Sequence, residues 1–261
     1  MVTETRTIKS ISLKDKKEVS QVQDELALDE PICIFVNDEY QVTLIASPEQ
    51  KHELAVGYLL SENILNTPSD ISEIDNRENN IYVNLNKNVD LREVSMDRMN
   101  LIVTACAANP RSKPKSTKIP KVKSSISVYP SVIMDLFGEL TSRGDIHLKT
   151  RGTHSAMLGS IEGKVLAFAE DVGRHNAVDK VIGSLFLAKG DLSQCILLST
   201  GRQSGEMVLK AARAGIPVVS SMTVPLTSGV RLAEASGITL TALGLGSLKV
   251  YSNPERIKVP S

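Results

Sequence analysis

Apolar and polar positions along the first third of the chain predict a small α/β unit. Two apolar runs, at 32–36 and 40–46, flank an Asn-Asp dipeptide and predict a hairpin. The next segment predicts a helix, with Ser47 as its N-cap and Gln50 closing a capping box. A further apolar run at 81–85 predicts another strand.

Strands and helices alternate in the second half of the chain. The spacing of apolar residues predicts helices at 130–144, 175–190, 204–215 and 227–237 and strands at 155–160, 164–170, 195–200, 216–221 and 238–243. Alternation at this spacing favours a largely parallel sheet covered by helices, and ligands of such sheets lie beyond the carboxyl ends of the strands. Two of these ends carry polar residues, at 199–202 and 220–221.

The predicted domain organisation has four parts. Residues 1–25 are polar and are expected to be loosely ordered, and residues 26–108 form a smaller α/β lobe. Residues 109–124 hold six basic residues, three prolines and no acid, which argues against a helix or a central strand. This segment is either a solvated linker or a cationic loop beside a phosphate-bearing ligand or an acidic partner. Residues 125–261 form the α/β core.

Composition narrows the function classes and the compartment. Lys plus Arg and Asp plus Glu number 30 each, which argues against a nucleic-acid-binding or membrane-binding protein. The polar N-terminus lacks the apolar centre of a signal peptide, and no apolar run is long enough to span a bilayer. Cys33, Cys106 and Cys195 are sparse and unevenly spaced, which suits a reducing compartment. We therefore expect a cytoplasmic protein.

Cys106 is the candidate nucleophile. It follows the apolar run LIVTA and opens into the basic segment, where Arg111, Lys113 and Lys115 would favour the thiolate. A buried structural cysteine is the alternative, because free cysteines are among the most buried residues. Cys33 and Cys195 lie inside apolar runs and are interpreted as structural.

A polar junction between a strand and a helix, at 170–180, is the first candidate binding site. A glycine lets the main chain turn tightly there, and the first N–H groups of the following helix can bind a phosphate or a carboxylate. The candidate residues are Asp171, Gly173, Arg174, His175 and Asn176, together with His154 at the start of an earlier strand. Caps and surface ion pairs are the alternative, which accounts well for Asp179 and Lys180.

A second junction, STGRQSGE at 199–206, has similar chemistry. It places hydroxyl groups, two glycines and an arginine ahead of a helix, which suits an anion. The candidate residues are Ser199, Gly201, Arg202 and Ser204. The lysine of a P-loop is missing, so the sequence does not indicate a nucleoside triphosphatase.

A zinc deaminase is disfavoured by the same residues. That chemistry needs H-x-E and P-C-x-x-C. His154 has no Glu two positions later, and Cys106 has Asn109 where a second cysteine is needed. No other grouping of His and Cys has metal-ligand spacing, so we expect no zinc.

Nearly the whole chain resembles the formate dehydrogenase accessory sulfurtransferases, the FdhD family. The most specific segment is EDVGRHNAVDKVIG at 170–183, and the segment at 199–219 resembles the family's Ser-Gly-Arg helix segment. NDEYQVTLIASPEQKHELAVGYLLSENI, TVPLTSGVRLAEASGITL and VYSNPERI resemble the N-terminal and C-terminal blocks of the family.

The resemblance implies a cytidine-deaminase-like three-layer αβα core, a smaller N-terminal lobe and a homodimer. It also implies that a cysteine desulfurase passes sulfur to a loop cysteine. That cysteine delivers the sulfur to the molybdenum of a bis-molybdopterin guanine dinucleotide cofactor, which formate dehydrogenase or a related molybdenum or tungsten enzyme then receives. The two junctions would hold the nucleotide ends of this cofactor, together with Ala242, Leu243, Gly244, Leu245, Gly246 and Ser247.

Three departures from the family pattern bear on the mechanism. The family loop reads C-G-x-C-G, whereas Asn109 stands at the second cysteine. Arg151 replaces a glycine of the T-G-G-x-H motif, and segment 242–247 lacks the usual Phe and Arg. A persulfide relay formally needs one thiol, so the sequence predicts a sulfurtransferase that acts through Cys106. A cofactor chaperone or insertase without sulfur chemistry is the alternative.

Overall fold

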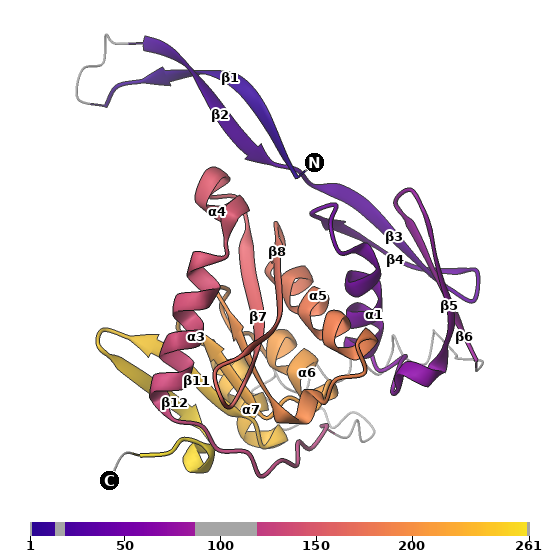
Figure 1. Cartoon of the computed structure of the whole chain (residues 1–261), viewed down its shortest axis with the longest axis vertical. Helices are drawn as coiled ribbons and strands as arrows, with labels where there is room; N and C mark the ends of the chain where they lie inside the picture. Colours follow the sequence, from indigo (N-terminus) through magenta and orange to yellow (C-terminus); the bar gives the residue numbers. More distant parts are fainter. Residues whose placement is uncertain (1, 14–18, 87–118, 260–261) are drawn as a thin grey trace, which may run out of the picture.

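The computed structural model describes residues 2–13, 19–86 and 119–259, and its largest part is a six-stranded sheet between layers of helices (Figure 1). The strand order is β12-β11-β10-β9-β7-β8. These strands are β7 (His154–Ser160), β8 (Val165–Asp171), β9 (Cys195–Ser199), β10 (Val218–Ser221), β11 (Thr239–Gly244) and β12 (Ser247–Ser252).

The prediction of a largely parallel sheet is wrong. Only the pairs β9–β10 and β10–β11 are parallel, and the other three pairs are antiparallel. β7 and β8 form a hairpin through Gly163 at φ +82°, and β12 folds back on β11 through Gly246 at φ +67°. β12 could not be predicted from an apolar pattern, because this edge strand is mostly exposed and has no apolar run.

Alternate residues of the central strands face two separate cores. Ile196 and Leu198 of β9 face one core with α3, whereas Leu197 faces the other. The helices are α3 (Pro130–Ser142) on the first face, continued by α4 (Asp145–Thr150), and α5 (Arg174–Leu187), α6 (Gly205–Arg213) and α7 (Thr227–Ser236) on the second. Helices therefore cover both faces of the sheet, whereas the likeness to cytidine deaminases stays a prediction.

A second sheet of four strands forms the small lobe, with the order β4-β3-β6-β5. The lobe contains β3 (Glu30–Val36), β4 (Glu39–Ala46), α1 (Lys51–Ser61), β5 (Ile71–Arg77) and β6 (Asn80–Leu85). The predicted hairpin is confirmed, with Asn37 and Asp38 in the left-handed region at φ +49° and +64°. The predicted capping box is wrong, because Gln50 is left-handed and α1 has no side-chain cap. Ser47 instead bonds to the turn between β8 and α5.

Glycines allow α1 and α5 to touch main chain to main chain, which joins the small lobe to the core. A Cβ on Gly57 would collide with the main-chain oxygen of Asp179. A Cβ on Gly183 would collide with the main-chain oxygen of Glu53. The two helices are therefore packed at a distance that no larger residue at these positions permits.

The N-terminal residues form a two-stranded arm that projects from the body (Figure 1). β1 (Thr3–Ile11) pairs antiparallel with β2 (Val19–Ala27), and β2 approaches α4. The expectation that residues 1–25 are loosely ordered is therefore wrong for the described part of this segment. Strand pairing orders these residues without apolar burial, since most of their side chains are exposed.

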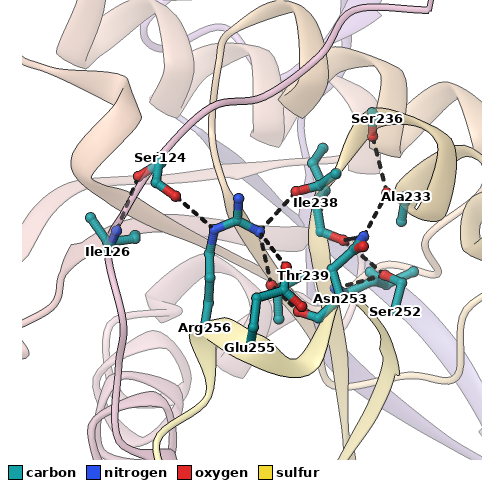
Figure 2. A network of polar contacts seen from close by, with 12 residues as sticks. Ser124, Ile126, Ala233, Ser236, Ile238, Thr239, Ser252, Asn253, Glu255 and Arg256 are labelled. Carbon is teal, nitrogen blue, oxygen red and sulfur yellow. Dashed lines mark hydrogen bonds and ion pairs between the residues drawn. The ribbon is translucent and has the colours of Figure 1, made fainter.

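A polar network fastens the C-terminal segment to the start of β11 (Figure 2). Arg256 is buried and donates to the main-chain oxygens of Gly237 at 2.8 Å and Ser124 at 3.3 Å. Asn253 donates to the main-chain oxygens of Ala233 and Ile238 at 3.0 and 2.8 Å. The VYSNPERI segment therefore secures the chain where it returns to the core. No helix in the described ranges is long and apolar enough to cross a bilayer.

Candidate functional site

Most of the predicted binding residues gather at one edge of the six-stranded sheet. Strand register aligns His154 with Asp171 at the ends of β7 and β8. It also aligns Ser199, Ser221 and Ala242 across the ends of β9, β10 and β11. This edge holds the carboxyl ends of the parallel strands, which is where α/β sheets bind ligands.

Asp171 supports the turn between β8 and α5. Its side chain is fully buried, and its Oδ1 accepts from Gly173 N at 2.8 Å and from Asn176 Nδ2 at 2.9 Å. Its Oδ2 lies 2.6 Å from Lys180 Nζ. These contacts give Asp171 and Asn176 a shaping role beneath the turn that carries Arg174 and the first N–H groups of α5.

Arg174 lies against the second junction. A Cβ on Gly201 would come within 2.8 Å of Arg174 Cβ, so a glycine at this position lets the two junctions touch. The Nε of Arg174 is buried and makes no hydrogen bond to any described residue. Buried donors without a partner are uncommon. An anion between the two junctions would supply that partner.

His154 adds a neutral group to the same edge. Its Nδ1 lies 3.2 Å from Thr200 Oγ1. Burial lowers the pKa of the His154 ring, and the nearby charges of Arg174 and His147 lower it further. The imidazole is therefore neutral near pH 7 and adds no charge to this edge.

The loop after β9 is built around the main-chain oxygen of Gly201. This oxygen accepts from Gln203 Nε2 at 3.1 Å, and Ser199 Oγ accepts from the same nitrogen at 3.0 Å. The Ser204 side chain caps α6. Arg202 is exposed, so its guanidinium is the most accessible cation of this loop.

His175 lines a different hollow, a polar pocket of about 250 Å³ between α1, α5 and α6. Its Nε2 lies 3.6 Å from Glu206 Oε2. Asp179 and Lys210 line the same pocket as a buried ion pair, with Nζ 2.7 Å from Oδ2. The structure therefore places His175 in a second polar cluster, although it follows Arg174 in the sequence.

Only part of segment 242–247 belongs to the edge. Ala242 is buried in the strand register described above, and Leu243 packs partly against the core below α3. Leu245 and Gly246 form the turn to β12, and the Leu245 side chain is fully exposed. This segment therefore offers main-chain groups and an apolar tip rather than charge.

Comparisons with known proteins decide the family. The FdhD/NarQ family matches residues 27–258. The chain belongs to this family. A Sulfolobus acidocaldarius protein named Sulfur carrier protein FdhD is 34% identical over 257 residues, covering 97% of this chain and 98% of that relative. A protein of the same name from Cupriavidus necator is 33% identical over 261 residues, covering 97% and 91%.

A solved structure agrees with this assignment. The crystal structure from Desulfotalea psychrophila, named as a formate dehydrogenase accessory protein, matches with a TM-score of 0.80 and 26% identity. The match covers 99% of this chain and all of that chain. The mixed α/β architecture is therefore shared within the FdhD/NarQ family.

One departure from the FdhD/NarQ pattern has a structural signature. Arg151, which the sequence resemblance aligns with a glycine of the family motif, ends α4 in the left-handed region at φ +57°. Glycine adopts this conformation freely, whereas a residue with a side chain is strained in it. The backbone thus keeps the shape that a glycine would favour.

The predicted nucleophile, Cys106, lies outside the described residues, as does Asn109. Cys195 is fully buried, and burial raises the pKa of its thiol to about 12, so its structural interpretation is confirmed. Cys33 is half-buried, with its sulfur 3.3 Å from Thr43 Oγ1. Across the described ranges, no three His, Cys, Asp or Glu side chains are grouped as metal ligands.

The span 87–118, which carries Cys106, follows β6 of the small lobe and returns to the core at the opposite edge of the six-stranded sheet. Before it, Asn86 N donates to Asp70 O at 2.8 Å. After it, Val122 N donates to Ser236 O at 2.8 Å, at the end of α7. A cleft of about 800 Å³ also lies at this edge, and none of the predicted site residues lines it.

Sequence reasoning missed the contribution of the small lobe. Ser47 donates its main-chain N–H to Asp171 Oδ2 at 3.1 Å, and its main-chain oxygen accepts from Lys180 Nζ at 3.0 Å. No local pattern reveals a contact across 124 positions. The interpretation of Asp179 and Lys180 as caps or surface ion pairs is wrong, because both side chains are buried.

Proposed function

We propose that this chain is a sulfur carrier for formate dehydrogenase or a related molybdenum or tungsten enzyme. It would take sulfur from a cysteine desulfurase on Cys106 and pass it to a guanine-dinucleotide molybdenum cofactor held as cargo. Membership of the FdhD/NarQ family, whose relatives carry the name sulfur carrier protein, supports this proposal.

The observation that carries the cargo part of the proposal is the contact between the two junctions. Three candidate contacts for an anion lie at this one edge of the sheet. They are the unpartnered Nε of Arg174, the neutral ring of His154 and the exposed side chain of Arg202. Arginine and helix N-termini are suited to phosphate groups. These residues would contact the phosphates of the cargo, and the molybdenum chemistry belongs to the cargo itself.

Loading of Cys106 is a thiol exchange. The Cys106 thiolate attacks the outer sulfur of the donor's persulfide, the donor's S–S bond breaks, and a new S–S bond forms on Cys106. The donor leaves as a thiolate and takes up a proton. The reaction consumes one thiol and yields one, so Asn109 at the second cysteine position does not prevent it.

Mass spectrometry tests the carrier step. After incubation with a desulfurase and cysteine, we expect one added sulfur on the Cys106 peptide, and none on that peptide in Cys106→Ala. Cys33→Ser is the matched control and should load as well as the wild type. The carrier proposal is wrong if no sulfur is added at Cys106 and Cys106→Ala still matures the client enzyme.

Asn109 favours a second candidate function, a cofactor chaperone or insertase without sulfur chemistry. This function predicts that Cys106→Ala retains both guanine-nucleotide binding and client maturation. The sulfur carrier predicts that the variant retains binding and loses maturation. A homodimer, which the family resemblance implies, is part of both proposals and is measurable by light scattering.

A further inference from the structure

We propose that the buried pair formed by Asp171 and Lys180 sets the charge of the anion site, and that the small lobe holds this pair in place. The inference rests on the proposed function, because it concerns the site that would bind the phosphates of the cargo. Neither residue would touch the ligand. Both would act through the turn that carries Arg174.

The pair is closed off from water. Both side chains are fully buried, and Lys180 Nζ lies 2.6 Å from Asp171 Oδ2. The small lobe bonds to both members of the pair. The main-chain N–H of Ser47 donates to the Asp171 carboxylate, and the main-chain oxygen of Ser47 accepts from the Lys180 ammonium group. The Ser47 hydroxyl accepts from Val172 N at 3.2 Å, inside the turn itself.

The other carboxylate oxygen shapes the anion site. Asp171 Oδ1 accepts from Gly173 N and from Asn176 Nδ2, which also donates to Ile45 O of the small lobe at 2.8 Å. A Cβ on Gly173 would come within 2.7 Å of Asn176 Nδ2, so the turn is packed tightly around this oxygen. The Asp171 carboxylate therefore fixes the position and direction of the first N–H groups of α5.

The stability of the fold does not by itself require the two charges of Asp171 and Lys180 at this buried position. An apolar pair of similar volume often stabilises a buried site as well as an ion pair does. Burial lowers the pKa of Lys180, and Asp171, Glu49 and Glu53 oppose that shift. An ammonium group retained beside Asp171 cancels a buried negative charge that would otherwise repel a phosphate at the start of α5.

This role predicts opposite effects of two single substitutions on the binding of GDP. Lys180→Met leaves the Asp171 carboxylate uncompensated, and we expect the affinity for GDP to fall about ten-fold. Asp171→Asn keeps the oxygen that accepts from Gly173 N and removes the negative charge, so we expect the folded variant to bind GDP at least as tightly as the wild type. Its amide nitrogen replaces the oxygen that accepts from Ser47 N, so we also expect a lower melting temperature. Guanosine, which carries no phosphate, should bind equally to both variants.

Titration calorimetry on the full chain, with GDP and guanosine as probes, tests the inference. The double variant Asp171→Asn/Lys180→Met removes both charges at nearly constant volume and should restore GDP affinity to within about two-fold of the wild type. It also supplies a folded comparison if Lys180→Met unfolds. Lys180→Arg, which keeps the charge, should retain GDP binding even where its melting temperature falls.

A merely structural pair would give a different pattern. Both single variants would then lose GDP and guanosine binding together, in step with their loss of stability, and the double variant would not recover GDP binding. Either result overturns the inference. A wild-type chain that binds no GDP contradicts the proposed cargo site instead, so the two failures are distinguishable.

Discussion

At the scale of single residues, the surroundings of each thiol decide its reactivity. Cys195 is buried in β9, its sulfur donates to Asp191 O, and its pKa is raised to about 12. The reactive thiolate is therefore scarce at pH 8. We expect iodoacetamide to leave Cys195 unmodified in the folded protein and to modify it after denaturation, as read by peptide mass mapping. Rapid alkylation of the native protein would contradict this burial.

His154 gives the stability of the protein a pH dependence of defined sign. Its pKa is lowered on folding, chiefly by burial and then by Arg174, so below pH 6.5 the unfolded chain binds more protons. Protonation of His154 therefore lowers the free energy of unfolding at acid pH, and this loss disappears as the pH rises to 6.5. Urea unfolding of the wild type and His154→Gln, at pH 5 to 7.5, should show the wild type gaining relative stability with pH. A constant difference would contradict the shift.

Arg151 carries backbone strain that a glycine would relieve. It ends α4 at φ +57°, where a side chain is unfavourable. We expect Arg151→Gly to stabilise the protein by about 0.5 kcal/mol, since the relief exceeds the entropy that glycine adds to the unfolded chain. Lys149→Gly, within the same helix, is the control and should destabilise by about 1 kcal/mol. Destabilisation by both would refute the strain argument.

At the scale of elements, the contact between α1 and α5 depends on glycine. We expect Gly183→Ala to destabilise the protein by about 2 kcal/mol, because its Cβ would meet the main chain of Glu53. Gly138→Ala in α3 is the matched control, since its Cβ would meet nothing within 4 Å. That substitution should stabilise by about 0.5 kcal/mol. Thermal unfolding measures both, and equal shifts would contradict main-chain packing of these helices.

Elements with a strong apolar pattern were predictable, whereas elements defined by their partners were not. The hairpin at Asn37 and Asp38 and the helices of the core follow from local spacing and turn residues. β12 and the N-terminal arm have mostly exposed side chains, so no apolar pattern marks them. Ser47 is predicted to cap a helix because the capping pattern depends only on neighbouring residues. Its actual partners, Asp171 and Lys180, are distant in the sequence.

The same limit applies to the candidate site. Its position at the carboxyl ends of the strands follows from the alternation of strands and helices, and the structure brings His154, Arg174 and Gly201 to that edge. Their separation from His175 could not be predicted, because it depends on how α1 packs against α5 and α6. The burial of Lys180 is likewise a property of the assembled fold.

At the scale of the whole molecule, the proposed delivery of sulfur would connect two opposite edges of one sheet. The candidate phosphate site lies at the carboxyl ends of the strands, whereas the chain that follows Cys106 rejoins the core at their amino ends, where Val122 bonds to the end of α7. A five-residue strand such as β9 alone extends over about 15 Å. The length of chain between Cys106 and the core therefore limits delivery, although it does not limit loading.

Shortening that chain separates the two steps. Cys106 lies thirteen positions before Ile119, a reach of about 43 Å when extended, and deletion of residues 109–118 reduces it to about 10 Å. We expect the deletion variant to accept sulfur from a desulfurase and to fail in client maturation.

Replacement of residues 109–118 by ten Gly and Ser residues keeps the reach and removes the charge. Maturation by that variant would assign the segment a tether role, and its loss would assign a role to the basic side chains. Full maturation by the deletion variant would contradict delivery across the sheet within one chain.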